Sequence, residues 1–181
     1  MTWFRCGGGN SAILKEEQIT DISGFTKIAN TSLAYGSTGT RVISNLGIVD
    51  ENIIYAHMAN GWQDSNSAFY DSENLIGAYG GYEFNEKISS LSKVKFWFGR
   101  YSGQNKTLIA TVQYLDGDGN WQDIDDIDIT ASISYPINTV EIAINQPNCY
   151  GIRWIHKNGE NKTSGNNICF FGMTLYELRR S

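Results

Sequence analysis

The sequence predicts an all-β sandwich, and three observations carry that prediction. Short segments rich in aromatic and β-branched residues follow one another along the chain. The breaks between them consist of Gly, Asn, Asp and Ser, with only 2 prolines in 181 residues. Helix-forming residues stand in sequence only over residues 15–22, where no clear apolar face accompanies them. Short strands separated by frequent turns are typical of sandwich folds.

The composition suits one folded domain and restricts its partners. With 41% hydrophobic and 13% aromatic residues, the chain can bury a sizeable core. Its net charge of -5 offers no basic surface for nucleic acid or an anionic membrane, so neutral ligands are favoured. No apolar run approaches the ~20 residues of a membrane span, and residues 1–6 lack the apolar core of a secretory signal peptide. We therefore expect a protein made in the cytoplasm.

The first elements in chain order are a leader and a short helical segment. Residues 1–20 are interpreted as an N-terminal segment in which Gly7, Gly8 and Gly9 form a flexible joint. Residues 15–22, which overlap the end of this segment, are predicted to form a short helix. The folded domain is expected over residues 21–181.

The clearest strands lie in the second half of the chain. Residues 139–144 alternate between apolar and polar side chains, as a half-buried strand does. The best predicted strands are residues 94–98, 108–115, 140–144, 150–155 and 168–178.

The turn after residues 108–115 resembles part of a calcium-binding loop. Asp116, Asp118 and Asn120 alternate as in the first half of a calcium loop. The twelfth position counted from Asp116 is Ile127, where an EF-hand loop needs a bidentate Glu. Gly119 can supply the positive φ of a short hairpin turn. The sequence therefore predicts a solvated hairpin tip without tightly bound calcium.

The cysteines and histidines indicate neither a disulfide framework nor a catalytic site. Cys6, Cys149 and Cys169 are too few and too irregular for a disulfide framework, so reduced thiols are expected, with a bond between Cys149 and Cys169 as the less favoured alternative. The two histidines, His57 and His156, lie in no known catalytic motif.

One acidic segment could still suggest glycoside cleavage, which needs two carboxyl groups flanking one bond. The four aspartates of this segment alternate with isoleucines, so a polar strand or loop face is the better interpretation. They are Asp123, Asp125, Asp126 and Asp128. We expect the protein to have no catalytic activity.

The order of these segments also resembles a known family. Residues 81–84 read Gly-Tyr-Glu-Phe, a Val-containing strand and a loop follow, and residues 112–121 end in an Asp-Gly turn and a Trp. Residues 149–158 resemble a penultimate strand with Arg153 at its recurrent Arg, and residues 170–178 resemble a closing strand. Over residues 41–178 the pattern resembles a discoidin-type domain, the galactose-binding-like jelly roll of coagulation-factor C domains and many bacterial carbohydrate-binding modules. The resemblance implies a jelly-roll β-sandwich that binds sugar.

The resemblance also implies a binding loop. Galactose-binding members carry an Arg and then an Asn where this chain has Arg100 and Asn105, and both residue types suit sugar hydroxyls. Members usually carry a His just after the upstream Trp, whereas this chain has Gln63 and Asp64, so the sugar need not be galactose. Trp62 or Tyr101 can supply a stacking ring. The candidate ligand-binding residues are Trp62, Asp64, Arg100, Tyr101 and Asn105.

Two further expectations concern tryptophans and metal. Trp97, Trp121 and Trp154 are interpreted as core residues. Some discoidin-type modules hold a structural calcium through an Asp before the upstream Trp, but Asn60 stands there. The chain is therefore expected to bind at most a weak calcium near Asn60 and Asp64, and no other cofactor.

Together these features predict a non-catalytic carbohydrate-binding module that recognises a glycan through loops at one end of a jelly roll. Residues 4–10 resemble the openings of small bacteriophage and prophage tail proteins, so the module is placed in a phage tail or similar surface-recognition assembly associated with the virion. The alternative is a structural or oligomerising tail accessory protein without a sugar site, which binds other tail or surface proteins.

Overall fold

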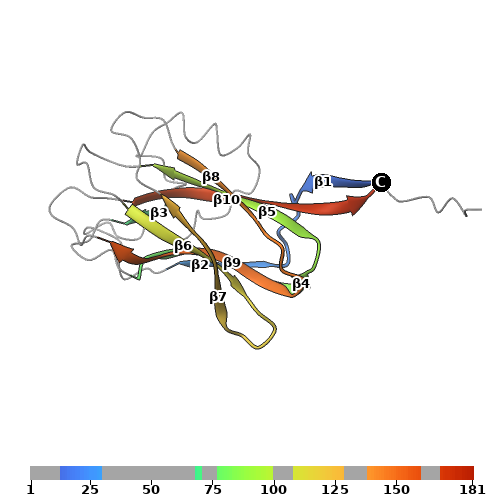
Figure 1. The fold of residues 1–181 in the computed structure, drawn as a ribbon, viewed down its shortest axis with the longest axis horizontal. Helices are drawn as coiled ribbons and strands as arrows, with labels where there is room; N and C mark the ends of the chain where they lie inside the picture. Colours follow the sequence, from blue (N-terminus) through green and yellow to red (C-terminus); the bar gives the residue numbers. More distant parts are fainter. Residues whose placement is uncertain (1–12, 30–67, 71–76, 100–107, 129–137, 160–167) are drawn as a thin grey trace, which may run out of the picture.

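The described residues are organised as β-strands throughout. The computed structural model describes residues 13–29, 68–70, 77–99, 108–128, 138–159 and 168–181, which contain ten strands and no helix (Figure 1). Within these ranges no helix is long and apolar enough to cross a membrane.

The first sheet is built around the long C-terminal strand β10. Its order is β1-β10-β5-β8, and β3 also pairs with β10, all in antiparallel fashion. The strands are β1 Leu14–Gln18, β3 Ala68–Tyr70, β5 Leu91–Gly99, β8 Asn138–Ala143 and β10 Ile168–Arg180.

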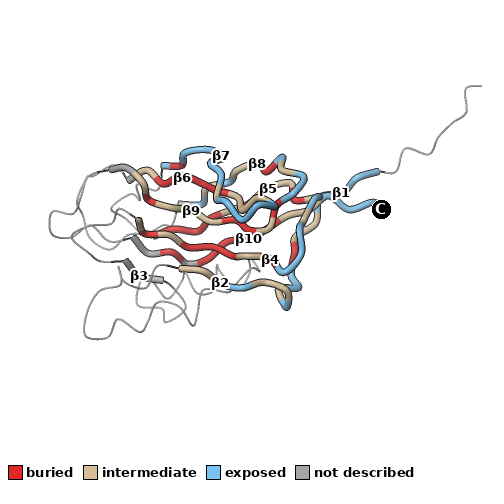
Figure 2. Tube along the Cα trace, turned by 90° about the horizontal axis from the view of Figure 1, so that it is seen from below, coloured by how far each residue is buried: buried red, intermediate tan, exposed pale blue. Residues whose placement is uncertain are grey.

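The second sheet lies against the first, has five antiparallel strands and is centred on β9 (Figures 1 and 2). Its order is β2-β4-β9-β6-β7. The strands are β2 Phe25–Ala29, β4 Tyr79–Ile88, β6 Leu108–Leu115, β7 Trp121–Asp128 and β9 Cys149–Gly159. The all-β sandwich prediction is thus confirmed, and each of the five predicted strands corresponds to an observed one.

The helix prediction for residues 15–22 is wrong. Residues Leu14–Gln18 form β1, which pairs with β10 from Leu14 opposite Arg180 to Gln18 opposite Tyr176. Lys15, Glu16 and Glu17 favour a helix locally, but cross-strand pairing decides their conformation. The division of the chain at residues 20 and 21 stays a prediction, with β1 lying on its N-terminal side.

An aromatic cluster joins the two sheets. The ring of Trp154 from β9 meets Phe98 of β5 edge-on at 5.3 Å and Phe170 of β10 at 5.5 Å between centroids. Phe98 and Phe170 lie 5.4 Å apart within the first sheet. All three side chains are essentially inaccessible to solvent. Figure 2 shows the buried stretches, in red, concentrated on the strands of both sheets. Trp154 is confirmed as a core residue.

Two adjacent glycines on β4 make this packing fit. A Cβ at Gly80 would lie 2.9 Å from both the Phe170 ring and Trp154 Nε1. A Cβ at Gly81 would lie 2.1 Å from the carbonyl oxygen of Ile152 and 2.6 Å from Cα of Arg153. Gly80 therefore leaves room for the aromatic cluster, and Gly81 allows β4 to approach β9 closely.

The turn between β6 and β7 is a hairpin tip, as predicted. Asp116 Oδ1 accepts hydrogen bonds from the backbone N–H groups of Asp118 and Asn120, and Asp116 Oδ2 accepts one from the Gln122 side chain. These bonds lower the pKa of Asp116, that from Asn120 most strongly. Gly119 has a φ of 82°, which a glycine adopts without strain. The carboxylate that suggested a metal ligand therefore holds the turn together.

Cys149 is a free, buried thiol, so the less favoured disulfide is not formed. Burial raises its pKa to about 11. The thiol therefore stays protonated at neutral pH.

His156 on β9 is fully buried. Its Nδ1 lies 2.8 Å from the carbonyl oxygen of Ile109, which can only accept a hydrogen bond, so Nδ1 carries the proton. Its Nε2 is buried and finds no hydrogen-bond partner among the described residues. Burial therefore lowers the pKa of His156, because a second proton would add a charge without an acceptor.

The Gly81 contact predicts a large loss of stability for Gly81→Ala. The added methyl group meets backbone atoms of β9 rather than a movable side chain, so the variant is expected to lose about 3 kcal/mol or more of unfolding free energy. Gly117→Ala is the matched control, because its nearest neighbour is the Tyr150 ring at 3.6 Å; its change should stay within about 0.5 kcal/mol. Urea unfolding of both variants measures this, and equal stabilities would contradict the close approach.

The burial of His156 predicts a loss of stability in mild acid. Because the folded-state pKa lies below the ordinary 6.5, the stabilising effect is complete above about pH 6.5 and is lost as the pH falls through the folded-state value. Urea unfolding of the wild type and His156→Gln between about pH 8 and pH 5 isolates this effect. The variant should have the flatter profile, and parallel profiles would show that His156 is not responsible.

Candidate functional site

The connections that carry the predicted binding residues leave the sandwich at one end. Residues 100–107 follow Gly99 and precede Leu108, and these flanking residues belong to different sheets. Gly99 pairs with Cys169, and Leu108 pairs with Gly159. We call the end formed by these strand termini the loop end (Figure 1).

The same registers bring more strand termini to the loop end. Ala29 pairs with Gly80, Tyr70 with Ile168, Phe98 with Asn138 and Ile109 with Asp128. Each of the connections 30–67, 71–76, 100–107, 129–137 and 160–167 therefore starts and finishes there.

The predicted ligand-binding residues lie in these connections, outside the described residues. They are Trp62, Asp64, Arg100, Tyr101 and Asn105, together with the calcium position near Asn60. They stay predictions. The described strands establish that the connections holding all of them start from one end of the sandwich.

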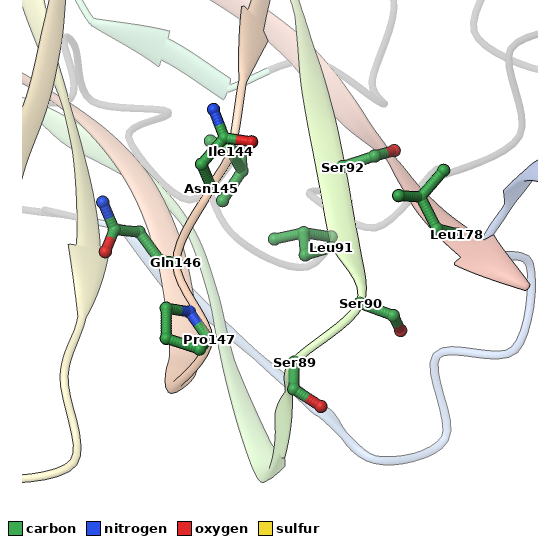
Figure 3. A pocket seen from close by; sticks show the side chains of 9 residues that line it. All are labelled: Ser89, Ser90, Leu91, Ser92, Ile144, Asn145, Gln146, Pro147 and Leu178. Atoms are coloured by element: carbon green, nitrogen blue, oxygen red, sulfur yellow. The ribbon is translucent and has the colours of Figure 1, made fainter. Parts of the chain in front are cut away.

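The opposite end carries a shallow depression of about 300 Å³ between the β4–β5 turn and the segment after β8 (Figure 3). Leu91, Ile144 and Leu178 give it an apolar part. Two of its three serines have partners of their own, since Ser90 Oγ donates to Glu177 Oε2 and Ser92 Oγ donates to Glu16 Oε1. We assign no function to it.

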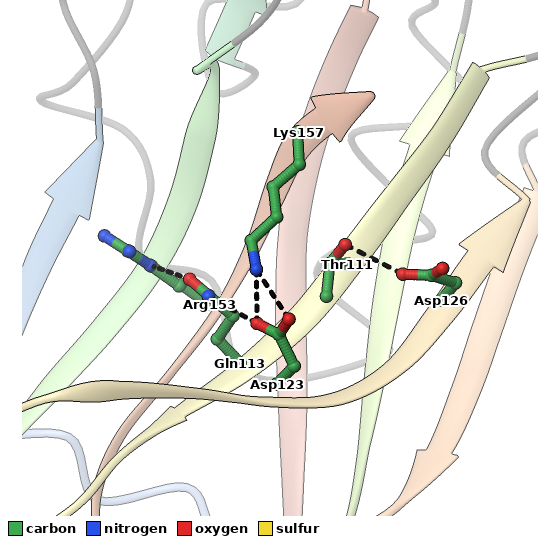
Figure 4. Close-up of polar contacts among 6 residues, drawn as sticks. All are labelled: Thr111, Gln113, Asp123, Asp126, Arg153 and Lys157. Atoms are coloured by element: carbon green, nitrogen blue, oxygen red, sulfur yellow. Dashed lines mark hydrogen bonds and ion pairs between the residues drawn. The ribbon is translucent and has the colours of Figure 1, made fainter. Parts of the chain in front are cut away.

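The outer face of the second sheet holds a more ordered arrangement. Gly81, Arg153, Gln113 and Asp123 stand side by side in register on β4, β9, β6 and β7. Arg153 Nε donates to Gln113 Oε1 at 2.8 Å, and Gln113 Nε2 donates to Asp123 Oδ1 at 2.7 Å. Lys157 Nζ donates to Asp123 Oδ2 at 2.6 Å (Figure 4). We call Arg153, Gln113, Asp123 and Lys157 the polar chain.

The guanidinium of Arg153 also lies against two aromatic rings. Its Cζ is 4.2 Å from the ring centroid of Trp121 and 5.0 Å from that of Tyr79. Trp121 is half-buried on the outer face, so the expectation that it belongs to the core is wrong. The strand-and-turn pattern could not show this, because the partner of Trp121 comes from β9.

Trp97 is buried as expected, but it lies apart from the main core. It follows Phe96 and precedes Phe98 on β5, both of which point into the sandwich, so Trp97 points to the other side of that sheet. Its Nε1 donates to Thr174 Oγ1 at 3.5 Å.

Two carboxylates of strand β7 form hydrogen bonds with neighbouring side chains, an arrangement that differs from what glycoside cleavage needs. Hydrogen bonds from Lys157 and then Gln113 lower the pKa of Asp123, which keeps it ionised. Asp126 Oδ1 accepts a hydrogen bond from Thr111 Oγ1 at 2.8 Å. A general acid for glycosides needs a raised pKa, and Asp123 shows the opposite shift.

Within the described ranges, no group of three or more His, Cys, Asp or Glu side chains is placed to hold a metal ion. The predicted weak calcium site near Asn60 and Asp64 lies outside those ranges.

No model of a known protein family matches the chain, and no curated protein matches it. Solved structures do resemble it. The module CpGH89CBM32-5 from Clostridium perfringens, in complex with GalNAc-β-1,3-galactose, has 8% identity and a TM-score of 0.51, with 84% of this chain and 94% of that chain covered. A second module of this type, GH31 CBM32-2 bound to GalNAc, has 14% identity and a TM-score of 0.50, covering 84% of this chain and 97% of that one.

A third similar structure is a fragment of a putative chitobiase from Bacteroides thetaiotaomicron. It has 13% identity and a TM-score of 0.52, with 91% of this chain and 95% of that chain covered. At such identities the likeness concerns the fold. The chain has the jelly-roll β-sandwich fold of these carbohydrate-binding modules.

Proposed function

We propose that this chain is a non-catalytic carbohydrate-binding module that recognises a glycan at its loop end. The observation that carries the proposal is the shared fold with modules whose structures hold GalNAc-β-1,3-galactose or GalNAc. A fold alone does not decide function, so the proposal also needs a site. The loop end supports one, because the connections that contain Trp62, Asp64, Arg100, Tyr101 and Asn105 all start there.

The chemistry of these residues suits a sugar. A tryptophan or tyrosine ring covers the apolar face of a pyranose, and a guanidinium and an amide bind neighbouring hydroxyl groups. Gln63 and Asp64 stand where galactose-binding relatives carry a histidine. The sugar therefore need not be galactose, and a glycan-array screen is needed to identify it. GalNAc-β-1,3-galactose is the first probe, because similar modules hold it or GalNAc.

Removing Arg100 or Asn105 is expected to weaken binding while the fold is kept. Losing the charged donor of Arg100 costs about 1.5–3 kcal/mol, roughly a tenfold to hundredfold weaker affinity, and losing the neutral amide of Asn105 costs about 0.5–1.5 kcal/mol. Stability should change by no more than about 0.5 kcal/mol, as for an ordinary surface residue. Calorimetric titration with GalNAc-β-1,3-galactose, or with the best array hit, and thermal melting measure the two effects.

Arg179→Ala is the matched control for Arg100→Ala. It also removes one arginine, but from the exposed end of β10 beside Leu14 and Lys15, where its nearest carboxylate belongs to Glu177. Its affinity should equal that of the wild type. If Arg100→Ala binds as tightly as Arg179→Ala, the assignment of the site to residues 100–105 is wrong.

The assembly in which the module works is a separate hypothesis. Its basis is residues 4–10, whose sequence resembles the openings of phage tail proteins and which lie outside the described residues. Association with purified phage particles, measured by co-sedimentation, tests this hypothesis without reference to sugar.

One observation favours the alternative, a structural accessory protein. The large apolar side chains that are exposed among the described residues are Ile13, Leu14 and Leu178, all on or next to the paired strands β1 and β10. An exposed apolar patch of this kind suits a protein contact. Concentration-dependent association in light scattering, together with a glycan array without hits, would make the alternative the better interpretation.

A further inference from the structure

The outer face of the second sheet presents a positive charge that no carboxylate of the described residues contacts directly. Arg153 is held at three points, by Gln113 through Nε and by the rings of Trp121 and Tyr79. Its terminal nitrogens have no hydrogen-bond acceptor and no carboxylate within ion-pair distance among the described residues. Arg153 is half-buried, and Figure 4 shows the end of its guanidinium pointing away from Gln113.

The polar chain explains why Arg153 stays unpaired. Asp123, the carboxylate at the end of the chain, accepts hydrogen bonds from both Lys157 and Gln113. Gln113 is 4% exposed, so its side chain is fixed and orients the guanidinium. A neighbouring carboxylate, Glu83, stands on β4 opposite Gly151, so Glu83 and Asp123 act on Arg153 through space and form no ion pair with it. The guanidinium of Arg153 is thus fixed in orientation, and its terminal nitrogens can bind a ligand, although the chain as a whole has a net charge of -5.

We propose that this face is a second glycan-binding site, which takes an acidic sugar residue through a carboxylate held by Arg153. A guanidinium is a planar fork that holds the two oxygens of a carboxylate at once. Tyr79 and Trp121 add partly exposed ring surface on either side, which suits the apolar face of a pyranose. The inference rests on the proposed function, because it assumes that the module binds glycans, but it concerns different residues from those at the loop end.

The register provides room beside the guanidinium. Gly81 is the neighbour of Arg153 on β4, so that position has no side chain to cover the fork. Lys157 lies four residues further along β9 and is already bound by Asp123. The available fork therefore belongs to Arg153. Its matched control is Lys87, an exposed cation near the end of β4 whose Nζ donates to Asn148 Oδ1, outside the polar chain.

The experiment is a calorimetric titration of the full chain with tetragalacturonate and with the uncharged galactose tetrasaccharide of the same linkage. We expect the acidic probe to bind the wild type and Lys87→Gln within about threefold of each other, because Lys87 lies outside the polar chain. Arg153→Gln should bind it at least about tenfold more weakly, because a charge-assisted bidentate contact is lost. Arg153→Lys should also be about tenfold weaker, since an ammonium keeps the charge without the fork.

Thermal melting of each variant guards against loss of the fold. If Arg153→Gln unfolds below the assay temperature, Arg153→Lys decides, because a lysine keeps a cation against the two rings. Equal affinity of Arg153→Lys and the wild type, or equal losses in Arg153→Gln and Lys87→Gln, would overturn the proposal, since charge alone would then explain binding.

The loop-end variants separate this inference from the proposed function. If the neutral glycan of the array binds and tetragalacturonate does not, the second site is refuted and the proposed function stands. If Arg100→Ala abolishes binding of tetragalacturonate and Arg153→Gln does not, the acidic sugar binds at the loop end and the second site is again refuted. If neither neutral nor acidic glycans bind the wild type, both ideas fail.

Discussion

The close approach of the two sheets around Trp154 is the constraint on which the rest of the structure depends. Its ring fills the space between Phe98 and Phe170 of the opposite sheet, and the fit leaves no room for a side chain at Gly80. These three side chains are among the largest that are fully buried in the described core, so their burial contributes substantially to stability. Because Phe98 and Phe170 come close to the beginnings of the connections at the loop end, this cluster also fixes the strand termini that any loop-end site needs.

Strand β9 transmits that constraint to the surface. Side chains alternate between the two faces of a strand, so Trp154 in the core places Arg153 on the outer face and His156 in the interior near the loop end. The fixed backbone of β9 holds Arg153 in register with Gln113, while Gly81 lets β4 pack close on its other side. A substitution that disturbs the core at β9 is thus expected to reach both faces of the second sheet.

The parts of the fold that the sequence reveals are those decided locally. The hairpin at residues 116–120 is predictable because Asp116 and Gly119 act within a few residues of themselves. Strand β1 is not, since Lys15, Glu16 and Glu17 have helix-forming side chains and become a strand only by pairing with residues more than a hundred positions away. The outer-face position of Trp121 was missed for the same reason, because Arg153 reaches it from another strand. The loop-end residues, including Arg100 and Asn105, came from the family pattern and stay predictions.

The pairing of Leu14 with Arg180 has a mechanical consequence. The described chain enters and leaves the first sheet at the same point, through two neighbouring antiparallel strands. A tension applied between these two points would pull on the register pairs one after another, from Leu14–Arg180 toward Gln18–Tyr176, and would peel β1 away before it loaded the aromatic cluster. A force applied at these two points is therefore resisted by one hydrogen-bonded pair after another. The strands that carry the polar chain lie outside the path of this force.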